Sequence, residues 1–157
     1  MENSIQNITV LGAGTMGSAI AEFFAAAGHP VALYSRTEET LARARAAMAA
    51  DLAMLAETDG PREAADTVLS RVRCFTDLAQ ASAEADWVIE TVAEDAQVKK
   101  AVLEAADRAA PPHAYLTSDT SALNIFSFLE TGRPERVLIT HFFNPASLMP
   151  LVEMVPG

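Results

Sequence analysis

Residues 5–28, IQNITVLGAGTMGSAIAEFFAAAG, join an apolar run to a glycine-rich turn and then to a helical pattern. The run at 5–11 is typical of a β-strand, and residues 16–27 are typical of a helix. Gly28 is well suited to end that helix, because glycine readily adopts the left-handed conformation found after helix ends. The order strand, turn, helix predicts the first unit of an α/β domain.

Gly12, Gly14 and Gly17 stand between this strand and this helix at the spacing GxGxxG. Gly12 permits the tight turn, Gly14 lets the backbone approach a pyrophosphate without a Cβ clash, and Gly17 lets the helix pack close to the sheet. The helix N-terminus then presents unpaired N–H groups to the phosphates. The pattern predicts a dinucleotide-binding loop, with cofactor contacts from Gly12, Ala13, Gly14, Thr15, Met16 and Gly17.

The rest of the chain alternates short apolar runs with helical patterns. We expect further strands at residues 31–34, 73–75, 87–92, 115–117, 137–140 and 151–155. We expect a long helix from residue 38 to a break at 59–61, shorter helices at 62–70 and 96–109, and a helical turn at 124–129. This alternation predicts a Rossmann-type, doubly wound α/β fold, with a mostly parallel sheet and helices on both faces. Ligands then bind at the carboxyl ends of the strands.

The composition fits one domain and excludes several classes of partner. The 157 residues are 50% hydrophobic, which is enough to form a core. A net charge of −10 argues against nucleic acid or an anionic membrane as the main partner. The single cysteine, Cys74, provides no disulfide framework and favours a reducing, cytoplasmic location. We expect no secretory signal, and no apolar run approaches the roughly 18 residues that a membrane span needs.

Ser35 and Arg36 follow the predicted strand at 31–34, where this type of fold usually has an acidic residue that bonds the adenine ribose. A carboxylate would repel a 2′-phosphate, whereas a hydroxyl and a guanidinium would accept one. The sequence therefore favours NADP over NAD. Two alternatives are that Arg36 only stacks on adenine, and that Glu38 and Glu39 serve the ribose instead.

Three later segments, together with the glycine loop, resemble the L-3-hydroxyacyl-CoA dehydrogenase family. They are VIETVAE at 88–94 followed by VKK at 98–100, SDTSAL at 118–123, and HFFNP at 141–145 continuing to LVE at 151–153. The motifs occur in the family's order and span nearly the whole chain. The resemblance implies metal-free hydride transfer between the 3-hydroxyl of a 3-hydroxyacyl-CoA, for example 3-hydroxybutyryl-CoA, and a nicotinamide dinucleotide.

His141 and Glu153 suit this reaction by their own chemistry. Oxidation of a secondary alcohol requires a group that accepts the hydroxyl proton, and histidine can do so near neutral pH. Glu153 lies twelve residues later on the next extended segment, so it can fold back beside His141. A carboxylate there would fix the imidazole tautomer and stabilise the imidazolium. The resemblance assigns the same two residues the roles of general base and its partner.

The resemblance implies roles for four more side chains. Ser121 is expected near the nicotinamide and the substrate oxygen, although it is also a candidate N-cap for the following helical turn. Asn144 is expected to contact the nicotinamide side of the cofactor, with an Asn-Pro turn as the alternative role. Glu94 and Lys99 match positions near the nicotinamide ribose, and the alternative for Lys99 is a solvated helix charge.

Two positions depart from the family pattern. Asp119 stands where the family usually has asparagine, which affects local hydrogen bonding, and Ser35 stands where it usually has an acid, which affects the NAD preference. Glu90, at the end of a predicted buried strand, is a candidate hydrogen-bond acceptor for the loop that follows. Residues 38–70 correspond to the family's arm over the CoA.

Residues 1–157 correspond to the family's dinucleotide-binding domain, incomplete at its C-terminal end. Family members continue into a helical C-terminal domain that supplies dimer contacts, so we expect a homodimer only with that domain. Two other functions are compatible with the sequence. One is a related dehydrogenase of a carnitine-like or sugar hydroxy acid that uses the same His–Glu pair, and the other is a non-catalytic dinucleotide-binding module.

Overall fold

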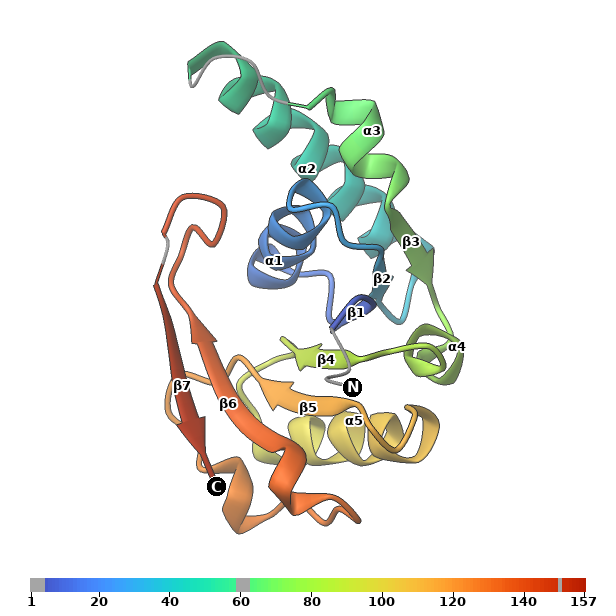
Figure 1. Ribbon diagram of the computed structural model, residues 1–157, viewed down its shortest axis with the longest axis vertical. Coiled ribbons are helices and arrows are strands. Elements are labelled where there is room, and N and C mark those ends of the chain that lie inside the picture. Colours follow the sequence, from blue (N-terminus) through green and yellow to red (C-terminus); the bar gives the residue numbers. More distant parts are fainter. Residues whose placement is uncertain (1–4, 59–62, 150) are drawn as a thin grey trace.

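The computed structural model describes residues 5–58, 63–149 and 151–157. Within them the strands are β1 (Ile8–Leu11), β2 (Val31–Tyr34), β3 (Val72–Phe75), β4 (Trp87–Glu90), β5 (Tyr115–Ser118), β6 (Val137–Phe142) and β7 (Val152–Pro156). They form one sheet in the order β3-β2-β1-β4-β5-β6-β7, in which β7 alone runs antiparallel to its neighbour (Figure 1). The predicted doubly wound, mostly parallel fold is confirmed.

Helices cover both faces of this sheet (Figure 1). One face carries α1 (Thr15–Ala26), α2 (Glu38–Thr58) and α3 (Ala65–Ser70), and the other carries α4 (Leu78–Ser82) and α5 (Ala96–Ala109). Two short 3₁₀ turns, η1 (Ile125–Ser127) and η2 (Pro134–Arg136), precede β6. In the part of the chain that the structure describes, every helix is too short or too polar to cross a bilayer.

Each face of the sheet buries its own apolar cluster. Ile8 and Val10 of β1 pack with Phe24 and its neighbours on the α1 side. Leu11, the next residue along, packs with Leu116 on the α5 side. Because successive side chains of a strand point to opposite faces, one four-residue strand contributes to both clusters. The apolar runs seen in the sequence are therefore strands covered on both sides.

Several element boundaries differ from the predictions. The strand predicted at 5–11 begins only at Ile8, because the backbone N–H groups of Gln6 and Asn7 donate to the side chain of Asp86 instead of to a strand. The strand predicted at 87–92 ends at Glu90, whose carboxylate accepts from the N–H of Val92. The helix predicted at 62–70 begins at Ala65; the predicted break at 59–61 and residue 62 lie outside the described residues.

The order in which the strands are added to the sheet reverses at β1, with β2 on one side of it and β4 on the other. The chain proceeds from β1 outward through β2 to β3, and then crosses back to β4 on the other side of β1. In doubly wound sheets the crevice at such a reversal, outside the carboxyl ends of the strands, is the ligand-binding position. Gly12 follows β1 and Thr91 follows β4, so both lie at this position.

Candidate active site

The three glycines of the loop differ in what surrounds them. Gly12 has φ of +118°, and a Cβ there would lie 2.7 Å from Oγ1 of Thr91. A Cβ on Gly17 would lie 1.8 Å from the carbonyl oxygen of Gly12. Around Gly14 no heavy atom lies within 4 Å of the Cβ position. Gly12 and Gly17 are thus required by packing within the chain, whereas Gly14 leaves open space where a ligand can approach.

Thr91 fastens the glycine loop to the sheet, a role that the sequence interpretation did not assign. Its N–H donates to the carbonyl of Leu11 at 2.8 Å, and its hydroxyl donates to the carbonyl of Gly12 at 3.0 Å. Its place directly after β4, opposite the end of β1, was the available signal.

A groove of about 400 Å³ runs beside the glycine loop, and we call it the glycine-loop groove. Gly14 is the N-cap of α1 and has no side chain that could accept from the N–H groups of the first turn of that helix. Uncapped helical N–H groups beside open space fit a phosphate group. The lining also includes Ser35 and Arg36, together with Thr37 and Thr40. The residues of the structure therefore fit a dinucleotide.

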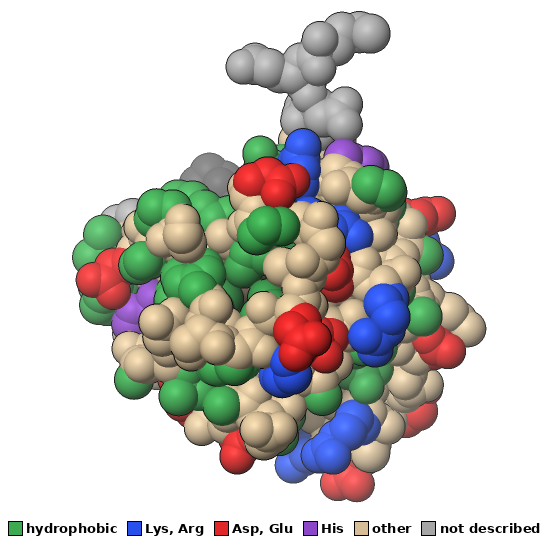
Figure 2. Space-filling model, turned by 90° about the horizontal axis from the view of Figure 1, so that it is seen from below, with side chains coloured by type: hydrophobic (Ala, Val, Ile, Leu, Met, Phe, Trp, Pro, Cys, Tyr) green, Lys and Arg blue, Asp and Glu red, His purple; other side chains and the backbone are tan. Residues whose placement is uncertain are grey.

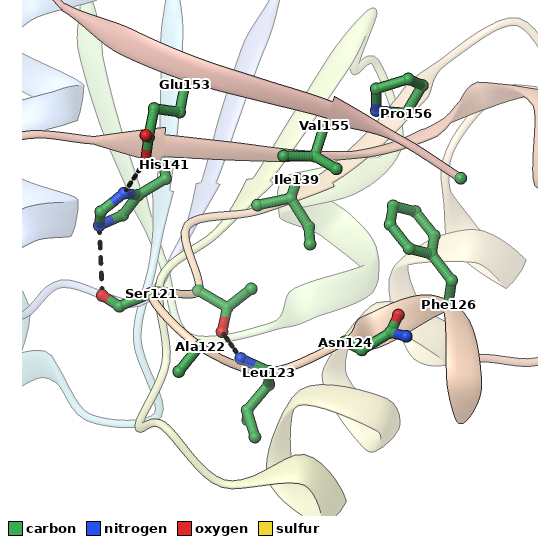
Figure 3. Close-up of a pocket in the computed structure, with 12 residues that line it drawn as sticks. Ser121, Ala122, Leu123, Asn124, Phe126, Ile139, His141, Glu153, Val155 and Pro156 are labelled. Carbon is green, nitrogen blue, oxygen red and sulfur yellow. Dashed lines mark hydrogen bonds and ion pairs between the residues drawn. The ribbon is translucent and has the colours of Figure 1, made fainter.

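His141, Glu153 and Ser121 form a hydrogen-bonded line (Figure 3). Nδ1 of His141 lies 2.9 Å from Oε2 of Glu153, and Nε2 lies 3.2 Å from Oγ of Ser121. His141 and Glu153 are directly opposed partners of the antiparallel pair β6–β7, which explains their separation of twelve residues. Because a carboxylate only accepts hydrogen bonds, Nδ1 donates to Glu153 and Nε2 is left as the basic nitrogen.

These three side chains line a cavity of about 470 Å³, which we call the His141 cavity. Figure 3 shows the imidazole pointing from β6 toward the Ser121 loop, with Ile139, Val155 and Phe126 along the opposite part of the cavity. The side chain of His141 is 26% exposed and that of Glu153 is 59% exposed, so both are open to solvent here. The cavity combines a short polar line with an apolar wall.

Glu94 holds the loop that carries Ser121. Its Oε1 accepts from the hydroxyl of Thr120 and from the N–H groups of Ser121 and Ala122. Burial opposes ionisation of this carboxyl, but these hydrogen bonds and the charge of Lys99 together keep the pKa of Glu94 below its usual range. The N-cap role considered for Ser121 is wrong, because the N-cap of η1 is Asn124, without a side-chain cap hydrogen bond. The hydroxyl that accepts from a backbone N–H here is that of Thr120, which accepts from Leu123 at 3.0 Å.

Lys99 lies inside the protein rather than on the helix surface. Its side chain is 1% exposed, and its ammonium lies 2.9 Å from Glu90 and 3.3 Å from Glu94. Glu90 is fully buried and also accepts from the hydroxyl of Ser118 at 2.6 Å. The alternative of a solvated Lys99 is therefore wrong. The expectation that Glu90 accepts from the loop that follows is confirmed by the N–H of Val92, and its carboxylate also joins β4, β5 and α5.

Asn144 lies in the loop after β6, exposed and outside the residues that line the two cavities described above.

The same hairpin exposes a group of hydrophobic side chains. Figure 2 shows hydrophobic side chains gathered on the left, the β7 side, and charged side chains of both signs on the right. The exposed members on and before β7 are Leu148, Met149, Leu151, Met154 and Val155. Among the described residues, no group of His, Cys, Asp or Glu side chains is arranged to hold a metal ion.

A doubly wound sheet with this glycine loop defines a dinucleotide-binding domain. The chain belongs to the 3-hydroxyacyl-CoA dehydrogenase family, because residues 7–157 match the family's NAD binding domain. Its cofactor class is therefore a nicotinamide dinucleotide, as the sequence predicted.

Individual relatives agree with this assignment. The chain is 40% identical over 156 residues to 3-hydroxyadipyl-CoA dehydrogenase of Escherichia coli K12, covering 98% of this chain and 33% of that protein. It is 35% identical to mitochondrial hydroxyacyl-coenzyme A dehydrogenase of Sus scrofa, covering 96% of this chain and 50% of that protein. The crystal structure of (S)-3-hydroxybutyryl-CoA dehydrogenase from Ralstonia eutropha has a TM-score of 0.91 at 30% identity, covering 98% of this chain and 55% of that one. The chain thus spans between a third and about half of these relatives.

Proposed function

We propose that this chain is the dinucleotide-binding domain of an enzyme that transfers a hydride between the 3-hydroxyl of a 3-hydroxyacyl-CoA and a nicotinamide dinucleotide. His141 is the general base and Glu153 is its partner. The observation that carries the proposal is the line Ser121–His141–Glu153 at the wall of a cavity, with Nε2 as the basic nitrogen. The family membership and the dehydrogenase names of the relatives support it.

The side chains have distinct tasks in this reaction. Nε2 of His141 takes the proton of the 3-hydroxyl as the C–H bond gives up its hydride, and the carbinol becomes a ketone. Glu153 holds the ring in the required tautomer and stabilises the imidazolium that forms. Ser121, held by Glu94, donates a hydrogen bond toward the substrate oxygen. The nicotinamide dinucleotide supplies the hydride acceptor, and the backbone of the glycine loop and α1 would hold its phosphates.

The adenosine end of the groove supports NADP as the preferred cofactor. In the described lining Arg36 is the charged residue, while Glu38 and Glu39 lie in the first turn of α2 and are not part of the lining. An Arg36→Asp variant should therefore lose NADP affinity and gain NAD affinity. Fluorescence titration with both reduced dinucleotides measures the ratio. An unchanged ratio would contradict the NADP preference and leave hydride transfer intact.

Asn144 and Lys99 keep more limited tasks in the proposal. Asn144, exposed beyond the end of β6, is available to the nicotinamide side of the cofactor. Lys99 acts on the cofactor side through Glu94, to which its ammonium is paired. The cytoplasmic location and a homodimer that depends on a C-terminal domain stay predictions from the sequence.

The test of the function compares His141→Ala with His113→Ala. His113 pairs with Asp86 before the amino end of β5, whereas His141 lies near the carboxyl end of the neighbouring parallel strand β6. Reduction of acetoacetyl-CoA should fall about 10²- to 10⁴-fold in His141→Ala, the usual range for loss of a general acid–base group. The dinucleotide affinity of His141→Ala should stay at the wild-type value. The His113→Ala variant should reduce acetoacetyl-CoA at the wild-type rate.

Other outcomes point to other functions. Dinucleotide binding without turnover of any hydroxy acid or its ketone would identify a non-catalytic binding module. Turnover of carnitine-like or sugar hydroxy acids but not of CoA esters would replace the substrate class and keep the His–Glu pair. Turnover that survives His141→Ala would refute the proposed general base.

A further inference from the structure

The end of β6 is held on one side by a side chain rather than by a strand. The pairing of β5 with β6 stops at Ser118 and Ile139. Strand β6 continues to Phe142 and carries His141 in this last part, where β7 pairs with one of its edges. On the other edge Oδ1 of Asp119 accepts from the N–H of Phe142 at 2.7 Å. The carboxylate thus takes the place of the missing strand acceptor, one residue from His141.

Asp119 is itself fixed and surrounded by charged groups from three elements. Its N–H donates to the carbonyl of Glu90 at 2.8 Å. Glu90 of β4 opposes its negative charge, while Lys99 of α5 and protonated His141 of β6 attract it. Burial is the largest effect and raises the pKa of Asp119 to about 6, against the hydrogen bond from Phe142 and those two cations. The carboxyl therefore changes charge near pH 6.

We propose that Asp119 is a positioning residue for His141, with a hydrogen bond that holds the end of β6 and a charge that stabilises the protonated imidazole. This inference rests on the proposed function, in which His141 gives and takes a proton. The two contributions are separable, because asparagine keeps an acceptor oxygen but carries no charge. Glu90 on β4, Glu94 after β4 and Glu153 on β7 are the other acids of the site, and all three remain in every variant below.

Ionised Asp119 should affect the two directions of the reaction in opposite ways. Reduction of the ketone begins with a protonated His141 that donates to the new alkoxide, and ionised Asp119 favours that form by attraction. Above the pH at which Asp119 ionises, the wild-type enzyme should therefore keep its reduction activity to a higher pH than the Asp119→Asn variant does. Oxidation begins with neutral His141 and should show the opposite change.

The decisive experiment uses NMR on the chain itself and does not need turnover. We expect the Asp119 carboxyl carbon to titrate with a midpoint near pH 6, and the ring signals of His141 to show an inflection at the same midpoint. Asp119→Asn should remove that inflection. Asp95→Asn is the matched control, since Asp95 likewise accepts from the backbone, from two N–H groups, but caps α5. It should leave the His141 signals unchanged.

Hydrogen exchange tests the positioning part. The Phe142 N–H should exchange at least about tenfold faster in Asp119→Ala, because a hydrogen bond to a charged group contributes at least about 1.5 kcal/mol. In Asp119→Asn its exchange should stay near the wild-type rate. Unchanged exchange in Asp119→Ala, or unchanged His141 ring signals in Asp119→Asn, overturns the inference. If Asp119→Ala does not fold, Asp119→Asn still decides the charge.

The results separate this inference from the proposed function. If the NMR changes occur and no hydroxyacyl-CoA is turned over, Asp119 positions His141 but the function is wrong. If turnover depends on His141 and its pH profile is identical in Asp119→Asn, the function stands and the charge contribution of Asp119 is refuted.

Discussion

Replacing Gly14 and Gly17 in turn by alanine should separate the binding role of the loop from its folding role. A Cβ at residue 17 would have to retreat from 1.8 Å to about 3.0 Å from the carbonyl oxygen of Gly12. That oxygen belongs to a backbone fixed by Thr91, so it cannot yield as a flexible side chain would. Overpacking costs about 1–3 kcal/mol where neighbours can adjust, and we expect the upper end here. The better helix propensity of alanine returns at most about 1 kcal/mol.

Alanine at position 14 should be tolerated by the fold. Its φ of −79° and ψ of −168° are accessible to alanine, and no atom lies within 4 Å of the new Cβ. Loss of a glycine N-cap costs about 0.5–1 kcal/mol, and the restricted unfolded chain returns a similar amount. Gly14→Ala should therefore fold with an unfolding free energy within about 0.5 kcal/mol of wild type. Its Cβ projects into the open space, so dinucleotide affinity should fall about tenfold or more, which is 1.4 kcal/mol.

Two measurements decide the matter. Urea unfolding, followed by the fluorescence of the single tryptophan, Trp87, gives the stability of both variants. Titration with a reduced dinucleotide gives the affinity. Unfolding of Gly17→Ala at the wild-type urea concentration would refute the packing role of Gly17, and wild-type dinucleotide affinity in Gly14→Ala would refute the binding role of Gly14.

Three further substitutions test the contacts around the site by urea unfolding. Lys99→Met leaves the carboxylate of Glu90 buried without its cation and should lower the free energy of unfolding by about 3–5 kcal/mol. A loss below about 1 kcal/mol, as for a surface ion pair, would contradict the burial of the Lys99–Glu90 pair. Asp95→Ala removes the acceptor for two N–H groups of α5 and should cost about 1 kcal/mol, which an unchanged unfolding midpoint would contradict. Asp119→Asn should gain stability over wild type between about pH 4 and pH 6 and then level off. The reason is that the pKa of Asp119 in the folded wild type is raised from 3.8 to about 6, so ionisation of this carboxyl destabilises the folded chain. The effect should be about 1–2 kcal/mol after allowance for the partial exposure of Asp119. A gain in stability that does not depend on pH would contradict this.

The fold was predictable because its signals are local. The glycine loop lies between an apolar run and a helix, and the alternation continues to residue 156. The helix α4 was missed for the same reason. It has five residues, too few for a periodic pattern, and it is stabilised by its packing on α5 and by Asp77, whose side chain accepts from the N–H of Gln80.

Parts of the site were predictable to different degrees. The pairing of His141 with Glu153 follows from two extended segments joined by a loop, and the register of β6 and β7 confirms their contact. The burial of Lys99 depends on how α5 packs against β4, and no pattern within α5 shows it, since a lysine at a helix start usually faces water. The contact of Asp119 with Phe142 arises because β5 ends before β6 does, a difference in strand length that residue types do not reveal.

The distribution of charge explains how a chain of net charge −10 can bind a phosphate-rich ligand. The described lining of the glycine-loop groove holds Arg36 and no carboxylate, so the phosphates meet helical N–H groups and a guanidinium. The acids lie instead at the His141 cavity, where Glu153 bonds His141, Asp119 interacts with its charge and Glu94 holds the Ser121 loop. That cavity is where the proposed reaction places positive charge, on the imidazolium and on the oxidised pyridine ring. An acidic site beside a neutral-to-basic groove is thus the arrangement that a dinucleotide with an anionic centre and a cationic ring requires, and the overall net charge does not oppose it.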